Sequence, residues 1–277
     1  MINKPYGEDI DAGFSSARAE QWQEGTLTER EDNVIEERPV ALVFNGISHA
    51  VMMTTPCDLE DFALGFSISE GILERRDQLF DIEVTTLAKG TQVDLSISAE
   101  KMVALKQRRR STAGRTGCGL CGAESLASAI RDGRKLTAAA MPAAAAIQKA
   151  VSSLSSWQRI QSVTGACHAA MWCDNSGDMT LLREDVGRHN AFDKLLGAMT
   201  RQQLSSDSGF AVISSRASYE MVHKASFLNC STLVAVSAPT SMAIEQAREL
   251  NINLIGFARN GRHTIYNRAL SGATQSV

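Results

Sequence analysis

The sequence predicts a chain of two domains, one of α/β and one of α+β type, and two observations support this. From residue 179 onward, strand-like and helix-like segments alternate, an order typical of βαβ crossovers in a mixed or mostly parallel sheet covered by helices. Between residues 38 and 105, two predicted hairpins surround one helix, as expected for a small α+β unit. The length of 277 residues suits one large or two modest domains, with ample material for a hydrophobic core. We expect a flexible N-terminal lead over 1–37, the α+β domain over 38–105, a basic loop over 106–122 and the α/β domain over 123–270.

The predicted α+β domain begins after a polar segment whose scattered glycines indicate flexibility. Asn45-Gly46 between two apolar runs is a strong signal for a tight hairpin turn. Asp58 is placed to cap a helix, and Gly71 is placed to end it. The predicted elements are strands over 39–44, 47–54, 82–87 and 93–98 and a helix over 58–70.

The predicted α/β domain has its informative side chains directly after its strands. Its predicted elements are helices over 123–131, 143–157, 190–199, 217–228 and 241–250 and strands over 160–172, 179–182, 210–214, 232–236 and 253–257. In open α/β sheets, ligands bind beyond the carboxyl ends of the strands. Hydroxyls and arginines follow four of these strands, and together they suit a phosphate-rich ligand the size of a nucleotide. The candidate binding residues are His189, Arg216, Ser237, Thr240, Gly261 and Arg262.

Each candidate also has a purely structural interpretation. Thr240 is suited to cap a helix, and Asn260-Gly261 is suited to form a tight turn. His189 precedes a helix, where it is either a hydrogen-bonded structural residue or a catalytic one oriented by a nearby acid. His168 lies within an apolar segment, which favours a place in the core.

Two cysteines lie three residues apart in the segment Arg115-Thr116-Gly117-Cys118-Gly119-Leu120-Cys121-Gly122. The glycines leave the backbone pliable and open to a partner, and nearby cationic side chains favour the thiolate over the thiol. These cationic residues are Lys106, Arg108, Arg109, Arg110 and Arg115. The pair suits a thiol that carries a sulfur atom, a thioredoxin-like dithiol or half of a zinc site. Zinc is the least favoured because no second Cys-x-x-Cys pair exists among the six cysteines, and the first two alternatives stay open.

The composition argues against several classes of protein. A net charge of −3 does not suit a nucleic-acid-binding polycation. No apolar run approaches the length that spans a bilayer, and the N-terminal residues do not resemble a secretory signal. We therefore expect a cytoplasmic protein with reduced cysteines and with neither nucleic acid nor membrane as a partner.

Several long segments together resemble one family. Besides the basic and cysteine-containing residues 108–122, the chain has the motif Glu184-Asp185-Val186-Gly187-Arg188-His189-Asn190-Ala191-Phe192-Asp193-Lys194. Further matching segments are 45–49, 62–66, 69–71, 164–170, 214–222 and 256–262. These segments resemble the FdhD family of formate dehydrogenase accessory sulfurtransferases, over about residues 38–266.

The resemblance implies a larger domain similar to the cytidine-deaminase-like fold, although the deaminase zinc signature is absent. It implies a sulfurtransferase, in which a cysteine desulfurase places a sulfane sulfur on Cys118 as a persulfide and Cys121 assists. The sulfur then passes to the molybdenum bis(molybdopterin guanine dinucleotide) cofactor that formate dehydrogenase requires. This cofactor is a bound substrate, and no catalytic metal of the protein's own is expected. The alternative is a chaperone that binds and protects the cofactor without transferring sulfur.

The resemblance also implies where the cofactor binds. The family's cofactor-binding stretch corresponds to Phe257, Ala258, Arg259, Asn260, Gly261 and Arg262. GDP is expected to bind there as a fragment of the cofactor. A ligand with two nucleotide arms suits a two-fold symmetric pair of sites, so a homodimer is expected.

Overall fold

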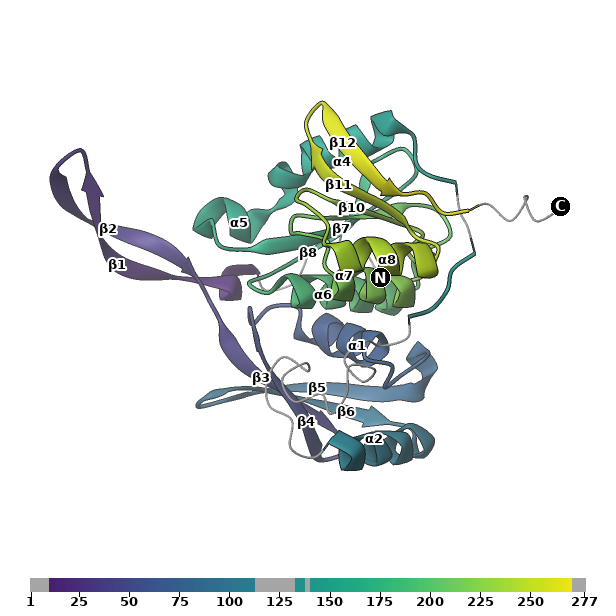
Figure 1. Ribbon diagram of the computed structural model, residues 1–277. Helices are drawn as coiled ribbons and strands as arrows, with labels where there is room; N and C mark the ends of the chain where they lie inside the picture. The colour runs from purple at the N-terminus through teal and green to yellow at the C-terminus, as the bar shows by residue number, and fades with distance from the viewer. Residues whose placement is uncertain (1–9, 113–132, 138–139, 271–277) are drawn as a thin grey trace.

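The computed structural model describes residues 10–112, 133–137 and 140–270, and Figure 1 shows their arrangement. The described strands form sheets of six, four and two strands. The six-stranded sheet has the order β12-β11-β10-β9-β7-β8. Its strands are β7 (His168–Cys173), β8 (Met179–Asp185), β9 (Phe210–Ile213), β10 (Thr232–Ala235), β11 (Asn253–Arg259) and β12 (Arg262–Asn267). Strands β9, β10 and β11 are parallel, as the alternating pattern predicts, and the remaining neighbours pair antiparallel.

Helices cover both faces of this sheet (Figure 1). The strands β9 and β10 are buried at every position, which is typical of strands with helices on both sides. One face packs against α4 (Ala144–Trp157), through a cluster that joins Ile147 and Leu154 to Val212 and Ile255. The other face packs against α6 (Arg188–Arg201), α7 (Tyr219–Phe227) and α8 (Ser241–Glu249).

The four-stranded sheet has the order β4-β3-β6-β5 and contains both predicted hairpins. Its strands are β3 (Arg38–Phe44), β4 (Ile47–Thr54), β5 (Leu79–Leu87) and β6 (Gly90–Ile97), with the short helix η2 (Arg76–Gln78) before β5. The helices α1 (Leu59–Ser69) and α2 (Ala99–Thr112) belong to the same part of the chain. A mixed α/β architecture is therefore confirmed, while the division into two domains and the likeness to cytidine deaminases stay predictions.

The helices α1 and α6 bring the two larger sheets together through an unusually close backbone contact. A Cβ atom added at Gly65 would lie 1.7 Å from the Asp193 carbonyl oxygen, and one at Gly197 would lie 1.9 Å from the Asp61 carbonyl oxygen. No side chain fits in either place, so glycine is required at both positions. One hydrophobic cluster runs from the four-stranded sheet across this contact to the six-stranded sheet.

The N-terminal residues differ from the flexible lead that we expected over 1–37. The short helix η1 (Ile10–Gly13) leads into β1 (Phe14–Gln23) and β2 (Thr26–Ile35), which pair antiparallel over their full length. Their turn has positive φ at Glu24 and Gly25, the geometry that tight hairpins favour. This hairpin, which we call the arm, projects away from the rest of the chain (Figure 1). Its strands are polar on both faces and so lack the apolar alternation that signals a strand.

Three further segments differ from the predicted elements. Residues 160–172 were predicted as one strand, but residues Arg159–Thr164 form the helix α5, which Gly165 ends at a φ of 68°. Residues 106–112 belong to α2 rather than to a loop, and β12 was not predicted at all. The predicted helix over 123–131 and the cysteine segment 113–122 lie outside the described residues. Among the helices that the structure does describe, none is long and apolar enough to cross a membrane.

Candidate functional site

The topology brings four strand ends to one edge of the six-stranded sheet. Because β7 is antiparallel to both β8 and β9, the carboxyl end of β8 lies on the same side as those of β9, β10 and β11. The segments after these strands hold His189, Arg216, Ser237 and Thr240, and β7 starts at this edge with His168. The structure therefore brings the predicted residues of these segments to a common edge, where α/β sheets bind ligands.

His189 lies in the first turn of α6 and is held by an acid, as one of its two interpretations requires. Its Nε2 atom is 3.0 Å from Glu220 Oε2, in the first turn of α7. Ser218 Oγ donates a second hydrogen bond to the same carboxylate oxygen at 3.1 Å. The hydrogen bond from His189, with the nearby Arg188 charge, lowers the pKa of Glu220 to about 2 despite its partial burial. Glu220 is therefore an anion that orients the imidazole ring.

A second histidine lies beside this pair. His168 is half-buried at the edge rather than in the core, and its Nδ1 atom is 3.5 Å from Ser214 Oγ. Partial burial lowers the pKa of His168, and the charge of Arg188 lowers it further. The Nε atom of Arg188 is buried without a hydrogen-bond partner among the described residues. Two histidines, an arginine and a carboxylate thus meet where β7 begins and β8 and β9 end.

A buried ion pair supports the segment that carries His189. Lys194 Nζ lies 2.7 Å from Asp185 Oδ2, and both side chains are fully buried. Asp185 also accepts hydrogen bonds from the backbone N–H groups of Thr55 and Gly187 at 3.0 and 2.8 Å. Burial alone would lower the pKa of Lys194, but the Asp185 carboxylate raises it above its ordinary value. Lys194 is therefore a charged ammonium group, and the hydrogen bonds that Asp185 accepts tie residues 185–187 to the segment that contains Thr55.

Most other residues of the 184–194 motif also stabilise the fold. Glu184 accepts hydrogen bonds from the backbone N–H groups of Ile160 and Gln161, at 2.9 and 3.0 Å, and so caps the start of α5. Asp193 pairs with Lys224 at 2.8 Å and accepts a hydrogen bond from Ser69 Oγ at 2.7 Å, which links α6, α7 and α1. This motif therefore builds the scaffold, and His189 and Arg188 are its members at the sheet edge.

The stretch 257–262 forms the end of the β11–β12 hairpin beside this edge. Phe257 has a φ of 48° and a side chain that is 39% exposed, and its backbone N–H donates to the Ser237 carbonyl at 3.0 Å. This irregularity in β11 turns Phe257 outward. Arg259, Asn260 and Arg262 are exposed and available to a ligand.

Three of the predicted ligand residues have structural roles instead. The Ala258 side chain is fully buried in the cluster against α4, so it is out of reach of a ligand. The Gly261 N–H donates to Gln148 Oε1 at 2.7 Å, so this backbone donor is already used within the protein. Thr240 Oγ1 accepts a hydrogen bond from the Ala243 N–H at 3.2 Å and is the cap of α8.

Sequence reasoning missed Glu220 and Arg188 and placed His168 in the core. Glu220 follows β9 while His189 follows β8, and their meeting depends on β7 lying between these strands. The strand order is a tertiary property that no local pattern contains. The sequence did contain one signal for Glu220: it is an acidic residue in the first turn of a helix, α7, that follows a strand of the sheet.

The four cysteines that the structure describes are buried. Burial raises the pKa of Cys57 to about 11, of Cys173 to about 12 and of Cys230 to about 11, and it raises the pKa of Cys167 as well. Such thiols are poor nucleophiles at neutral pH because they are almost entirely protonated. Cys118 and Cys121 lie outside the described residues. Within the described part of the chain, no cluster of three histidine, cysteine or acidic residues could hold a metal ion.

Comparison with known proteins identifies relatives over nearly the whole chain. Residues 35–271 match the model of the FdhD/NarQ family. The "Sulfur carrier protein FdhD" of Cupriavidus necator is 50% identical over 252 residues, which cover 91% of this chain and 88% of that protein. The protein of the same name in Bordetella bronchiseptica is 50% identical over 236 residues, covering 85% and 86% of the two chains. The crystal structure of "a putative formate dehydrogenase accessory protein" from Desulfotalea psychrophila is similar in fold, with a TM-score of 0.72 at 20% identity, over 92% of this chain and 96% of that one.

Proposed function

Since the chain belongs to the FdhD/NarQ family, we propose that it is a sulfur carrier for the maturation of formate dehydrogenase. In this proposal a cysteine desulfurase supplies the sulfur, and the molybdenum bis(molybdopterin guanine dinucleotide) cofactor receives it. The names of the relatives support a sulfur-carrier role. We expect the protein to act in the cytoplasm and as a homodimer.

The state of the cysteines carries this proposal. A sulfur carrier needs an accessible thiolate, and the four described cysteines are buried with raised pKa values. Cys118 and Cys121 remain as candidates. They lie in the glycine-rich segment 115–122, which contains one of the five cationic residues named above and follows the other four. Nearby cations favour the thiolate and steer anionic partners toward the segment.

The loading step needs no oxidant or reductant. The Cys118 thiolate attacks the terminal sulfur of the desulfurase persulfide, so that a new S–S bond forms at Cys118 and the desulfurase cysteine leaves as a thiolate. Release of the sulfur as sulfide needs two electrons, which Cys121 supplies by attacking the Cys118 sulfur and forming a disulfide with it. Cys121 is therefore proposed as the resolving thiol.

The sheet edge is proposed to bind the cofactor as the substrate of the transfer. Arg216, Arg259 and Arg262 are exposed there and suit the phosphates of a guanine nucleotide, while Phe257 offers an aromatic surface. The His189–Glu220 pair with Arg188 and His168 forms a second polar group at the same edge. We propose that GDP binds at the arginine-rich end.

A mass measurement tests the sulfur-carrier role directly. Incubation with a desulfurase and cysteine should add about 32 Da, one sulfur atom, to the protein. Cys118→Ala should abolish this adduct, whereas Cys121→Ala, the matched control in the same segment, should retain it. An adduct that persists in Cys118→Ala would contradict the assignment. If the Cys118→Ala/Cys121→Ala variant still matures formate dehydrogenase, the chaperone alternative is correct.

A further inference from the structure

One amide side chain of α4 holds both chain neighbours of Arg262. Gln148 Oε1 accepts a hydrogen bond from the Gly261 N–H at 2.7 Å. Gln148 Nε2 lies 2.9 Å from His263 Nδ1. Gln148 is 113 positions from Gly261 and 115 positions from His263 in the chain, so both contacts are tertiary. The backbone of Arg262 is therefore tied to α4 on either side.

The two contacts fix the amide of Gln148 in one orientation. A backbone N–H can only donate, so the atom of the amide that faces Gly261 is the oxygen. The amide NH2 group then faces His263 and donates to its Nδ1 atom. Nδ1 accepts this hydrogen bond only when the ring is neutral and carries its proton on Nε2. The donors and acceptors of these three residues thus fit together in a single arrangement.

This arrangement also decides which way the Arg262 side chain points. Successive side chains of a strand lie on opposite faces of a sheet. His263 contacts α4, and Ile265, two residues later, packs against the cluster that contains Ile147 of α4. Arg262 and Thr264 therefore lie on the face of β12 away from α4, and both are exposed. Gln148 thus aims Arg262 outward by holding His263 inward.

The turn that carries Arg262 has little packing around it. Residues 259–262 are exposed at every position. Gly261 has a φ of 82°, and a Cβ atom added to it would meet no residue beyond its chain neighbours within 4 Å. Ordering an exposed turn costs conformational entropy, which the contacts with Gln148 offset in the free protein. An arginine on a turn that is already ordered loses less freedom when it binds a ligand.

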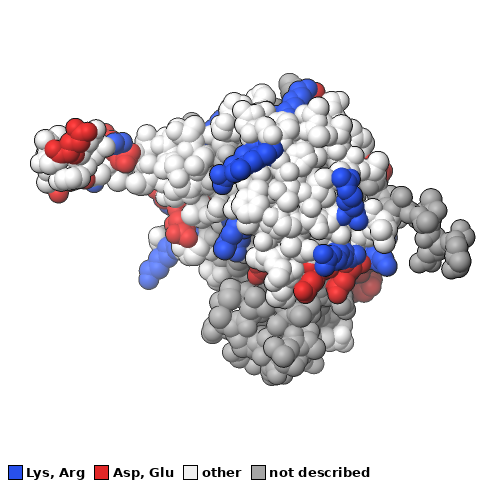
Figure 2. Space-filling model, turned by 45° about the horizontal axis from the view of Figure 1, so that its top comes forward, with Lys and Arg blue, Asp and Glu red and all other residues white. Residues whose placement is uncertain are grey.

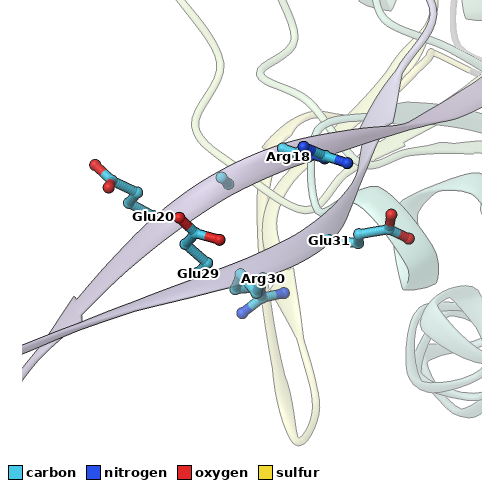
Figure 3. A pocket seen from close by; sticks show the side chains of 6 residues that line it. Arg18, Glu20, Glu29, Arg30 and Glu31 are labelled. Carbon is cyan, nitrogen blue, oxygen red and sulfur yellow. The ribbon is translucent and has the colours of Figure 1, made fainter.

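The turn of the β11–β12 hairpin suits a phosphate better than the arm, the other hairpin described above. The arm has five acidic and two basic residues, and acidic side chains gather on it in Figure 2. Its hollow, shown in Figure 3, is lined by Arg18, Ala19, Glu20, Glu29, Arg30 and Glu31. Three carboxylates against two guanidinium groups repel an anion. An anionic ligand is therefore expected at the sheet edge, where the position of each arginine matters.

We propose that Gln148 is a positioning residue for nucleotide binding, which holds the turn so that Arg262 presents its guanidinium group to a phosphate. This inference rests on the guanine-nucleotide site of the proposed function. Gln148 acts through Arg262, because its own Oε1 and Nε2 atoms are both used within the protein. The resulting order of the turn lowers the entropy that binding must overcome.

Calorimetric titration of GDP tests this role. Gln148→Met keeps the length of the side chain but removes both hydrogen bonds, and it should weaken GDP binding roughly fivefold. The matched control is Ser152→Ala, because the Ser152 hydroxyl donates only to carbonyl groups of α4 itself. In an Arg262→Ala background, Gln148→Met should cause little further loss, since the arginine that it positions is gone. Unchanged affinity in Gln148→Met, or the same loss in both backgrounds, would overturn the proposal.

Nuclear magnetic resonance tests the hold on the turn without any nucleotide. The Gly261 amide should exchange with solvent about tenfold faster in Gln148→Met than in the wild type. Neutral His263 should carry its proton on Nε2 in the wild type. In Gln148→Glu the carboxylate can only accept, so the proton should move to Nδ1.

These measurements separate the positioning role from the nucleotide site itself. Equal exchange rates of Gly261, or a wild-type proton on His263 Nδ1, would show that Gln148 does not hold the turn. A wild type that binds no GDP would contradict the nucleotide site of the proposed function, and the exchange rates and the tautomer would still decide whether Gln148 orders residues 261–263.

Discussion

His189 Nε2 and Glu220 Oε2 lie 3.0 Å apart and join the first turn of α6 to the first turn of α7. The two residues are 31 positions apart in the chain and meet because their helices start at the same sheet edge. Ser218 donates to the same carboxylate, so the acid is held from two sides. This relationship gives the first of four predictions.

The His189–Glu220 pair should make stability depend on acid pH. The folded-state pKa of Glu220 is about 2, below the value of about 4.3 in an unfolded chain. The stabilisation is therefore fully present above about pH 4.3 and is lost as the pH falls toward 2. Since Glu220 is partly exposed, the expected contribution is only about 0.5–1 kcal/mol. Urea unfolding between pH 6 and pH 3 should show a steeper loss for the wild type than for Glu220→Gln, and parallel curves would contradict this.

The Asp185–Lys194 pair should be essential for stability. Lys194→Met leaves the buried Asp185 carboxylate without its cation, which typically costs about 3–5 kcal/mol. The matched control is Lys149→Met, because Lys149 pairs with Asp178 at 2.7 Å with both side chains more than half exposed. That change should cost at most about 1 kcal/mol. Denaturant unfolding measures both values, and equal losses would show that burial does not matter here.

The contact between α1 and α6 should tolerate no side chain at Gly65. Gly65→Ala would place its Cβ atom 1.7 Å from the Asp193 carbonyl oxygen, so the two helices must separate. We expect a loss of about 3 kcal/mol or more in the free energy of unfolding. Gly25→Ala, in the turn of the arm, has nothing within 4 Å of the added atom and should cost about 1 kcal/mol through its positive φ alone. If both variants unfold at the same denaturant concentration, the close packing of α1 against α6 does not determine the stability of the protein.

The guanine-nucleotide site should depend on Arg262 without affecting sulfur loading. Losing a charge-assisted contact costs about 1.5–3 kcal/mol, so Arg262→Ala should bind GDP roughly tenfold to a hundredfold more weakly by calorimetry. Arg268→Ala is the control, because Arg268 is also an exposed arginine and follows the end of β12. The mass adduct on Cys118 should form normally in both variants. Equal GDP affinities would remove Arg262 from the site, and no binding to the wild type would remove the site itself.

Local patterns determined most elements of the six-stranded sheet. The apolar runs at 210–213 and 232–235 are strands because nearly every residue in them is apolar, as burial on both faces requires. The same alternation of strands and helices placed His189, Arg216, Ser237 and Thr240 beyond strand ends. The Cys118–Cys121 pair was recognised from spacing and neighbouring charge, neither of which depends on the fold.

Only the tertiary structure decided which of these residues are free to meet a ligand. The Gly261 N–H donates a hydrogen bond to Gln148 of α4, and the Ala258 side chain is buried in the core. Both follow because the β11–β12 hairpin packs against α4, a helix more than 100 residues earlier in the chain. The helix α5 replaces a predicted strand because Glu184, on the distant strand β8, caps its first turn. Likewise β1 and β2 are stabilised by pairing with each other rather than by burial, so their polar sequences contain no apolar alternation. Sequence patterns record which side chains are apolar, whereas hydrogen bonds between distant segments depend on strand order and packing, which form only in the folded chain.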